Sequence, residues 1–198
     1  MKKFTYLLIL IFVICFTCIY EATPMTSNQE VKLSLKTDKE AYCIGDAVIL
    51  EITFSNNSSK SIYLLPWNGG YSVNWLMAFD IDEQKKGSFP LVYRDIKFMP
   101  LFKDYILINP NSKYSITLKG KIFNGELSKF NRDYEKKYQG LFLNFGDSAI
   151  FLNSIGSFGL QAFYVGKNEW ADIAKKKYNI DGIILEKLES NKIHIEVR

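Results

Sequence analysis

Residues 31–65 read VKLSLKTDKEAYCIGDAVILEITFSNNSSKSIYLL, and this stretch decides the fold. Apolar residues occupy every second position in segments 31–35 and 48–54. A period of two is that of a strand with one buried face. The pair Gly45-Asp46 between the segments and the pair Asn56-Asn57 after them are residue types that favour turns. The sequence therefore predicts two half-buried strands, each followed or preceded by a turn.

Similar short apolar segments recur along the rest of the chain. The further predicted strands are Ile62–Leu65, about Trp75–Ile81, Tyr105–Ile108, Tyr114–Leu118, Phe158–Val165 and Ile193–Val197. Short strands separated by turns favour an antiparallel β-sandwich. The sequence lacks the alternation of strands with helices that would indicate a parallel sheet.

Two segments depart from this pattern. Residues 168–177 predict a short helix, with Asn168 as its N-cap and lysines in its last turn. Residues 121–156 mix aromatic and charged residues without a steady period. We interpret them as a solvated insertion that contains a short helix. The predicted fold class is all-β, an antiparallel β-sandwich with an inserted segment and one short helix.

The first twenty positions have the layout of an export leader. Lys2 and Lys3 precede the apolar run Phe4–Tyr20, and Glu21 follows at once. The run is short for a bilayer span, which usually takes about 20 residues. Cys18 lies at its end, where a bacterial lipoprotein carries its lipid-modified cysteine. Cleavage, lipidation at Cys18 and retention as an anchor all stay open.

The predicted organisation is a leader at 1–20, a polar linker at 21–30 and one domain at 31–198. Of 198 residues, 47% are hydrophobic and 23% charged, a globular balance. The formal net charge is +4, and without Lys2 and Lys3 there are 23 basic residues against 21 acidic ones. A surplus this small does not predict a nucleic-acid partner.

Catalytic motifs are missing from the sequence. His194 is the single histidine, which excludes any site that needs two, and the strand period places it on an outward face. No GxSxG, GxxxxGK or GxGxxG motif occurs. We therefore assign no catalytic residue, metal ligand or cofactor and expect a protein that is not an enzyme.

Three residues remain as candidates for special roles. Cys43 is expected to be a small buried hydrophobic side chain, since a cysteine nucleophile would need a histidine base. Trp67 and Tyr71 flank the pair Gly69-Gly70. They form either a platform for a carbohydrate or peptide ligand or, for Trp67, a cover over the edge of the sandwich.

The order of several segments resembles a known domain. Besides residues 33–65, the segments are PWNGG (66–70), LVYRDIKFMP (91–100), DYILINPNSKYSITLKG (104–120), SFGLQAFYV (157–165) and LESNKIHIEV (188–197). Together they resemble the Ig-like β-sandwich that precedes the catalytic domain of deuterolysin-like, lysine-specific metalloendopeptidases and occurs in related bacterial secreted proteins.

This resemblance covers about Val31–Lys119 and Ser157–Val197 and implies an Ig-like fold in an extracytoplasmic setting. Arg94-Asp95 stand where that family tends to have glycine, and the chain has no HExxH motif, so no catalytic residue is carried over. We expect a non-enzymatic, exported or envelope-anchored binding protein with a protein or carbohydrate ligand. The alternative is a proteinase inhibitor or prodomain-like protein that covers a protease in trans.

Overall fold

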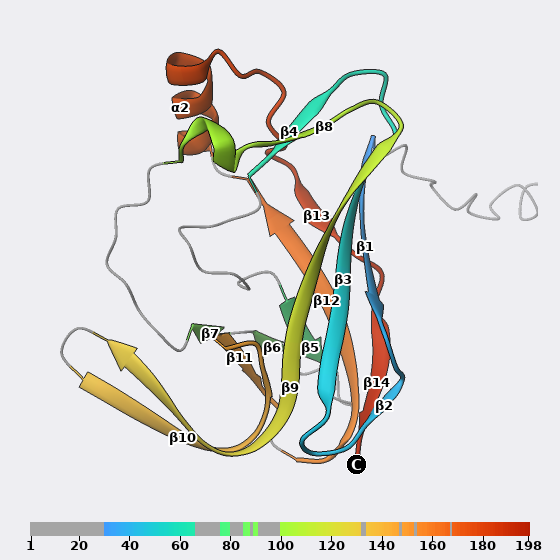
Figure 1. Ribbon diagram of the computed structural model, residues 1–198, viewed down its shortest axis with the longest axis vertical. Helices are drawn as coiled ribbons and strands as arrows, with labels where there is room; N and C mark the ends of the chain where they lie inside the picture. Colours follow the sequence, from blue (N-terminus) through green and yellow to red (C-terminus); the bar gives the residue numbers. More distant parts are fainter. Residues whose placement is uncertain are drawn as a thin grey trace, which may run out of the picture.

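A computed structural model shows two curled, mostly antiparallel sheets that face each other across one core, with a small third sheet and a helix at one end (Figure 1). The all-β, sandwich-like fold expected from the sequence is confirmed. The structure describes residues 30–65, 76–79, 85–87, 89–90, 100–131, 134–146, 148–152, 154–166 and 168–198.

The first sheet has the strand order β1-β3-β9-β10-β11-β7. Its strands are β1 (Val31–Thr37), β3 (Ala47–Asn56), β9 (Ser112–Asn131), β10 (Tyr134–Asn144), β11 (Ser148–Phe151) and β7 (Phe89–Pro90). β1 and β3 pair from Val31 with Asn56 to Thr37 with Leu50. The apolar side chains of β3 at positions 48, 50, 52 and 54 are at most 1% exposed, which confirms the predicted period.

The second sheet has the order β2-β14-β12-β5-β6, and β13 also pairs with β12. Its strands are β2 (Ala41–Tyr42), β14 (Ile193–Val197), β12 (Gly156–Val165), β5 (Leu76–Phe79), β6 (Lys85–Gly87) and β13 (Lys187–Glu189). The chain crosses from the first sheet to the second at β2, which runs parallel to β14. His194 is exposed on the outer face of β14, as predicted.

A smaller apolar cluster closes the end of the sandwich that lies uppermost in Figure 1. Its buried residues are Leu65, Tyr105, Trp170, Ala174 and Ile180. They lie on or next to helix α2 (Asn168–Tyr178) and next to β4 (Ile62–Leu64), β8 (Ile106–Ile108) and the 3-10 turn Phe102–Asp104. Trp170 of α2 is buried, and its backbone oxygen accepts a hydrogen bond of 3.1 Å from the Tyr105 hydroxyl. The predicted late helix is therefore confirmed.

The helix expected within residues 121–156 is wrong for the described part of that segment. β9 continues through it to Asn131, and β10 and β11 follow. Ile122, Leu143 and Ile150 are completely buried and belong to the main core. The cross-strand pair Gly125 and Gly140 interrupts the apolar period where the ribbon bends. For this reason the apolar period did not predict these strands.

Candidate binding surface

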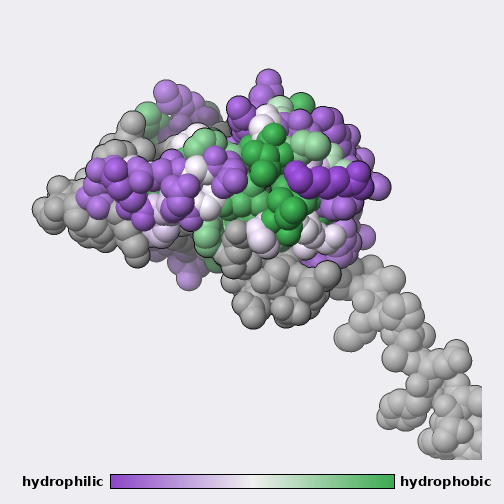
Figure 2. Space-filling view, turned by 90° about the horizontal axis from the view of Figure 1, so that it is seen from below, coloured by the Kyte–Doolittle hydropathy of each residue, from purple (hydrophilic) through white to green (hydrophobic). Residues whose placement is uncertain are grey.

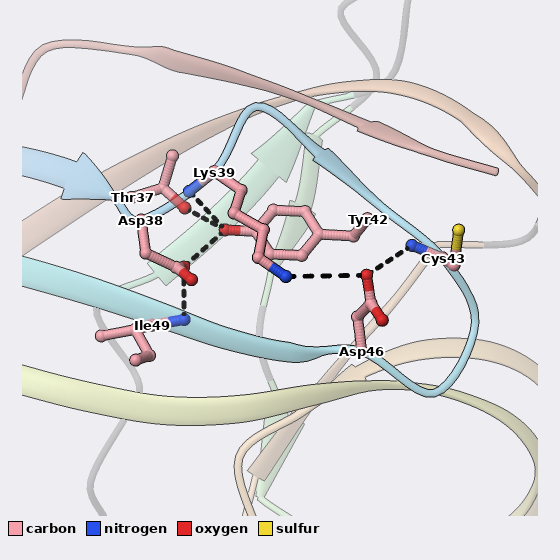
Figure 3. Close-up of polar contacts among 7 residues, drawn as sticks. All are labelled: Thr37, Asp38, Lys39, Tyr42, Cys43, Asp46 and Ile49. Carbon is pink, nitrogen blue, oxygen red and sulfur yellow. Dashed lines mark hydrogen bonds and ion pairs between the residues drawn. The ribbon is translucent and has the colours of Figure 1, made fainter.

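The end of the sandwich with the β2–β3 turn and the C-terminus, lowest in Figure 1, is called the lower end here. Tyr42 anchors it, with its ring 1% exposed and its hydroxyl at the centre of a hydrogen-bond network (Figure 3). That hydroxyl donates to Asp38 Oδ1 at 2.7 Å and accepts from the backbone N–H of Lys39 at 3.2 Å. It also bonds Thr37 Oγ1.

Asp38 links this network to β3. Its Oδ1 also accepts the backbone N–H of Ile49 at 2.9 Å. Some loss of solvent contact acts to raise the pKa of the exposed Asp38 carboxyl, but the hydrogen bonds from Ile49 and Tyr42 outweigh it and hold that pKa below the ordinary value. Burial, reinforced by the bond to Asp38, raises the pKa of Tyr42. At neutral pH the network therefore joins an ionised carboxylate to a neutral phenol.

Hydrogen bonds within the turn and to β9 fix the turn from Cys43 to Asp46. Asp46 Oδ2 accepts the Cys43 N–H at 2.9 Å, and the Asp46 N–H donates to the Cys43 oxygen at 3.0 Å. Gly45 has φ of 98°, a conformation that favours glycine, and its N–H donates to the Ile122 oxygen at 2.8 Å. This bonding holds the side chain of Ile44 outward, where it is 47% exposed.

The prediction that Cys43 is buried is wrong, since its side chain is exposed. Tyr42 takes the inward position at the end of β2, so the next residue faces outward, and the chain turns there. The periodicity argument failed because β2 has only two residues, too few for a readable period. The exposed thiol lies beside the exposed Ile44.

A second segment adds an apolar side chain at the lower end. Ile155 is 60% exposed and immediately precedes β12. Gly156 pairs with Val197, and Val197 with Tyr42, so the adjoining Ile155 and Cys43 reach the same rim of the sheet. Figure 2 views this end and shows hydrophobic residues gathered between hydrophilic ones. We call Cys43, Ile44 and Ile155 the apolar end.

At the upper end, Asn56 has a role that sequence reasoning missed. Its side chain is completely buried, and its amide donates to the backbone oxygens of Lys60 at 2.8 Å and Ile108 at 3.0 Å. Its Oδ1 accepts from the hydroxyl of Ser58 at 2.7 Å. Asn56 thus fastens the β3–β4 loop to β8, whereas the adjacent Asn57 is an exposed turn residue, as predicted.

Two grooves open on the described surface. One of about 610 Å³ lies at the upper end, between the start of β1 and residues 182–186. The other, of about 720 Å³, runs between β1 and β14 and includes Lys36, Glu40 and His194. Within it, the Asn191 amide accepts the Leu35 N–H at 2.9 Å and donates to the Leu35 oxygen at 3.0 Å. This side chain occupies the hydrogen-bonding groups that a further strand on β1 would need.

Other predicted site residues lie outside the described residues, namely Cys18, Trp67 and Tyr71. Their proposed roles in lipid attachment and ligand binding stay predictions. Among the described residues, no group of three or more His, Cys, Asp or Glu side chains could hold a metal ion. The same residues include no helix long and apolar enough to cross a membrane. Comparison with models of protein families and with curated proteins finds no match to this chain.

Proposed function

We propose that this protein is a non-enzymatic binding protein of the cell envelope that docks a protein partner through its apolar end. The observation that carries the proposal is the exposure of Ile44 and Ile155 at the same rim of the second sheet. Apolar side chains gathered on a surface and rimmed by polar ones are typical of interaction sites. The two side chains are aliphatic, which suits apolar side chains of a protein better than the flat face of a sugar ring.

The turn geometry supports docking with little conformational cost. The Tyr42 network and the bonds to Ile122 fix the backbone that carries Ile44 before any partner arrives. A surface ordered in advance loses less conformational entropy on binding than a mobile loop does. The charged neighbours Lys39 and Asp46 pair at 3.9 Å, so the rim offers no strong net charge to select a charged ligand.

The orientation of the domain suits an anchored protein. β1 begins at Val31 near the upper end, and the β2–β3 turn lies at the lower end (Figure 1). β3, with ten residues, spans about 30 Å between the two ends. A leader or lipid anchor ahead of Val31 would therefore leave the apolar end pointing away from the membrane.

Site-specific photo-crosslinking in intact cells tests this function. A crosslinking residue at position 155 is expected to give one defined protein adduct, which Ile44→Glu in the same chain abolishes. Leu107 is the matched control position, because it is 48% exposed at the other end of the molecule. Equal adducts from positions 155 and 107, or an adduct indifferent to Ile44→Glu, would contradict the proposal.

The identity of the adduct separates the two functions raised by the sequence. If the crosslinked protein is a proteinase, and the purified chain lowers its activity in a manner that Ile44→Glu relieves, the protein is an inhibitor. If the crosslinked partner has no proteolytic activity, the protein is a binding protein and not a proteinase inhibitor.

A further inference from the structure

The hairpin formed by the distal parts of β9 and β10 extends beyond the rest of the first sheet. β3 accompanies β9 only as far as Lys121, and β11 pairs with β10 only along Phe142–Asn144. Among the described residues, segments 125–131 and 134–140 therefore pair only with each other, and we call them the arm. Figure 1 shows the arm projecting at the lower left. A two-stranded ribbon alone is at best marginally stable in water, so the arm would gain from a further strand.

The hydrogen-bonding direction of each residue along β10 follows from two backbone hydrogen bonds. The Leu141 oxygen accepts the Leu152 N–H at 2.8 Å, and across the ribbon the Ile122 N–H donates to the Asp46 oxygen at 3.0 Å. Both residues thus point their backbone groups out of the ribbon. In an antiparallel pair this direction alternates, so Gln139, Lys137 and Glu135 also point outward along β10.

The side chains along this edge are complementary to themselves. Residues 134–138 read Tyr-Glu-Lys-Lys-Tyr, and both Glu135 and Lys137 are exposed. If two copies of this segment run antiparallel about a two-fold axis at position 136, Glu135 of each copy lies opposite Lys137 of the other. Opposite charges in directly facing positions stabilise an antiparallel pair.

We propose that the arm is a homodimerisation element, in which the outer edge of β10 pairs with the same edge of a second copy. The result is a four-stranded antiparallel sheet with an isologous interface. Two identical Glu135–Lys137 pairs favour this register of the four-stranded sheet. At the axis, position 136 of one copy faces position 136 of the other, and both are lysine, which opposes the pairing at that one position. Lys137 already bonds Glu126 of its own chain at 2.9 Å, which holds the cation on this part of the ribbon. This inference is independent of the apolar end.

Disulfide trapping of the full-length chain tests the register. The backbone of residue 136 bonds inward to β9, so across the proposed axis the two copies of position 136 form a non-hydrogen-bonded pair, with Cα atoms about 4.5 Å apart. That separation suits a disulfide. In a Cys43→Ser background, Lys136→Cys is expected to give a covalent dimer under mild oxidation. The exposed Lys113→Cys, near the other end of β9, is the control and should give at least about fivefold less.

A charge swap shows whether the pairing is between copies. In the Lys136→Cys chain, Lys137→Glu should lower the dimer yield about fivefold, and adding Glu135→Lys should restore it. Both variants lose the Lys137–Glu126 pair, so that loss cannot explain a difference between them. The proposal is overturned if position 136 traps no more dimer than position 113, if the single and double charge variants give equal yields, or if the covalent product contains a different protein.

Discussion

The β1–β3 ladder and the β9–β10 arm are both antiparallel pairs, but their registers are specified in different ways. In the ladder, alternate residues from Val31 to Leu35 and from Val48 to Phe54 fill the core, and a shift by one residue would turn them all to solvent. In the bend at the base of the arm, two glycines face each other and aromatic rings cover them. The comparison teaches that a register can rest on burial in one place and on ring-over-glycine contacts in another.

The bend shows the second mechanism in detail. Gly125 and Gly140 pair across the ribbon, both with positive φ. A Cβ atom built on Gly125 would lie 2.8 Å from the Phe123 ring, and one on Gly140 would lie 2.5 Å from the Phe151 ring. Phe123 and Phe151 both pack on the buried Phe142, with ring centroids 6.5 Å and 5.1 Å away. Only glycine leaves room for these rings at this bend.

The largest effect is expected in the ladder. Phe54 is completely buried, and its ring contacts that of Tyr164 edge-on with centroids 5.5 Å apart. Phe54→Ala should lower the free energy of unfolding by about 3–5 kcal/mol, from lost burial and the cavity left behind. Denaturant unfolding measures this change. Glu51→Ala, exposed on the opposite face of the same strand, should stay within about 0.5 kcal/mol, and comparable losses for both would contradict burial as the basis of this register.

The next largest effect is expected at the bend of the arm, where the addition of one methyl group would meet an aromatic ring. Gly140→Ala forces both an unfavourable φ of 148° and a clash with Phe151, so we expect a loss of about 2–3 kcal/mol. Gly146→Ala is the matched control, because its φ is 91° but its Cβ would meet nothing within 4 Å. It should cost about 1 kcal/mol. If Gly140→Ala and Gly146→Ala lower the free energy of unfolding equally, the clash with the Phe151 ring does not contribute to the cost.

This difference also explains how far the sequence could predict the molecule. The ladder, the late helix and the outward position of His194 follow from period and end signals, which are local in sequence. Gly140 and Phe151 meet only through the fold, so nothing local marked the arm as strand. The same holds for the candidate surface, since Ile44 and Ile155 are far apart in sequence and reach the same rim of the sheet only through the pairing of β2, β14 and β12. Asn56 left one usable signal, an asparagine at a strand end followed by serine two positions later.

A smaller effect is expected in the polar network that turns the ladder toward the second sheet. Tyr42→Phe keeps the buried ring and removes the hydroxyl that bonds Thr37, Asp38 and the Lys39 N–H. We expect a loss of about 1–2 kcal/mol in the free energy of unfolding, since the remaining polar groups can partly reach water. Tyr105→Phe, which removes the bond to Trp170 at the upper end, should cost about 1 kcal/mol. A Tyr42→Phe protein as stable as the parent would show that the network only positions the turn.

The smallest effect concerns the charge of Asp38, whose side chain is exposed yet carries two of the bonds that hold the turn. Because its pKa is lowered in the folded state, the ionised carboxylate stabilises the fold above the unfolded-state pKa, near 3.8. That contribution is lost as the pH falls through the folded-state pKa. Asp38→Asn keeps an acceptor oxygen but cannot titrate. The stability difference between parent and variant, measured by denaturant unfolding from pH 7 to pH 2.5, should therefore be constant down to about pH 5 and shrink below about pH 4. A difference that does not change with pH would mean that the charge of Asp38 contributes nothing, and that the turn is held by its neutral hydrogen bonds alone.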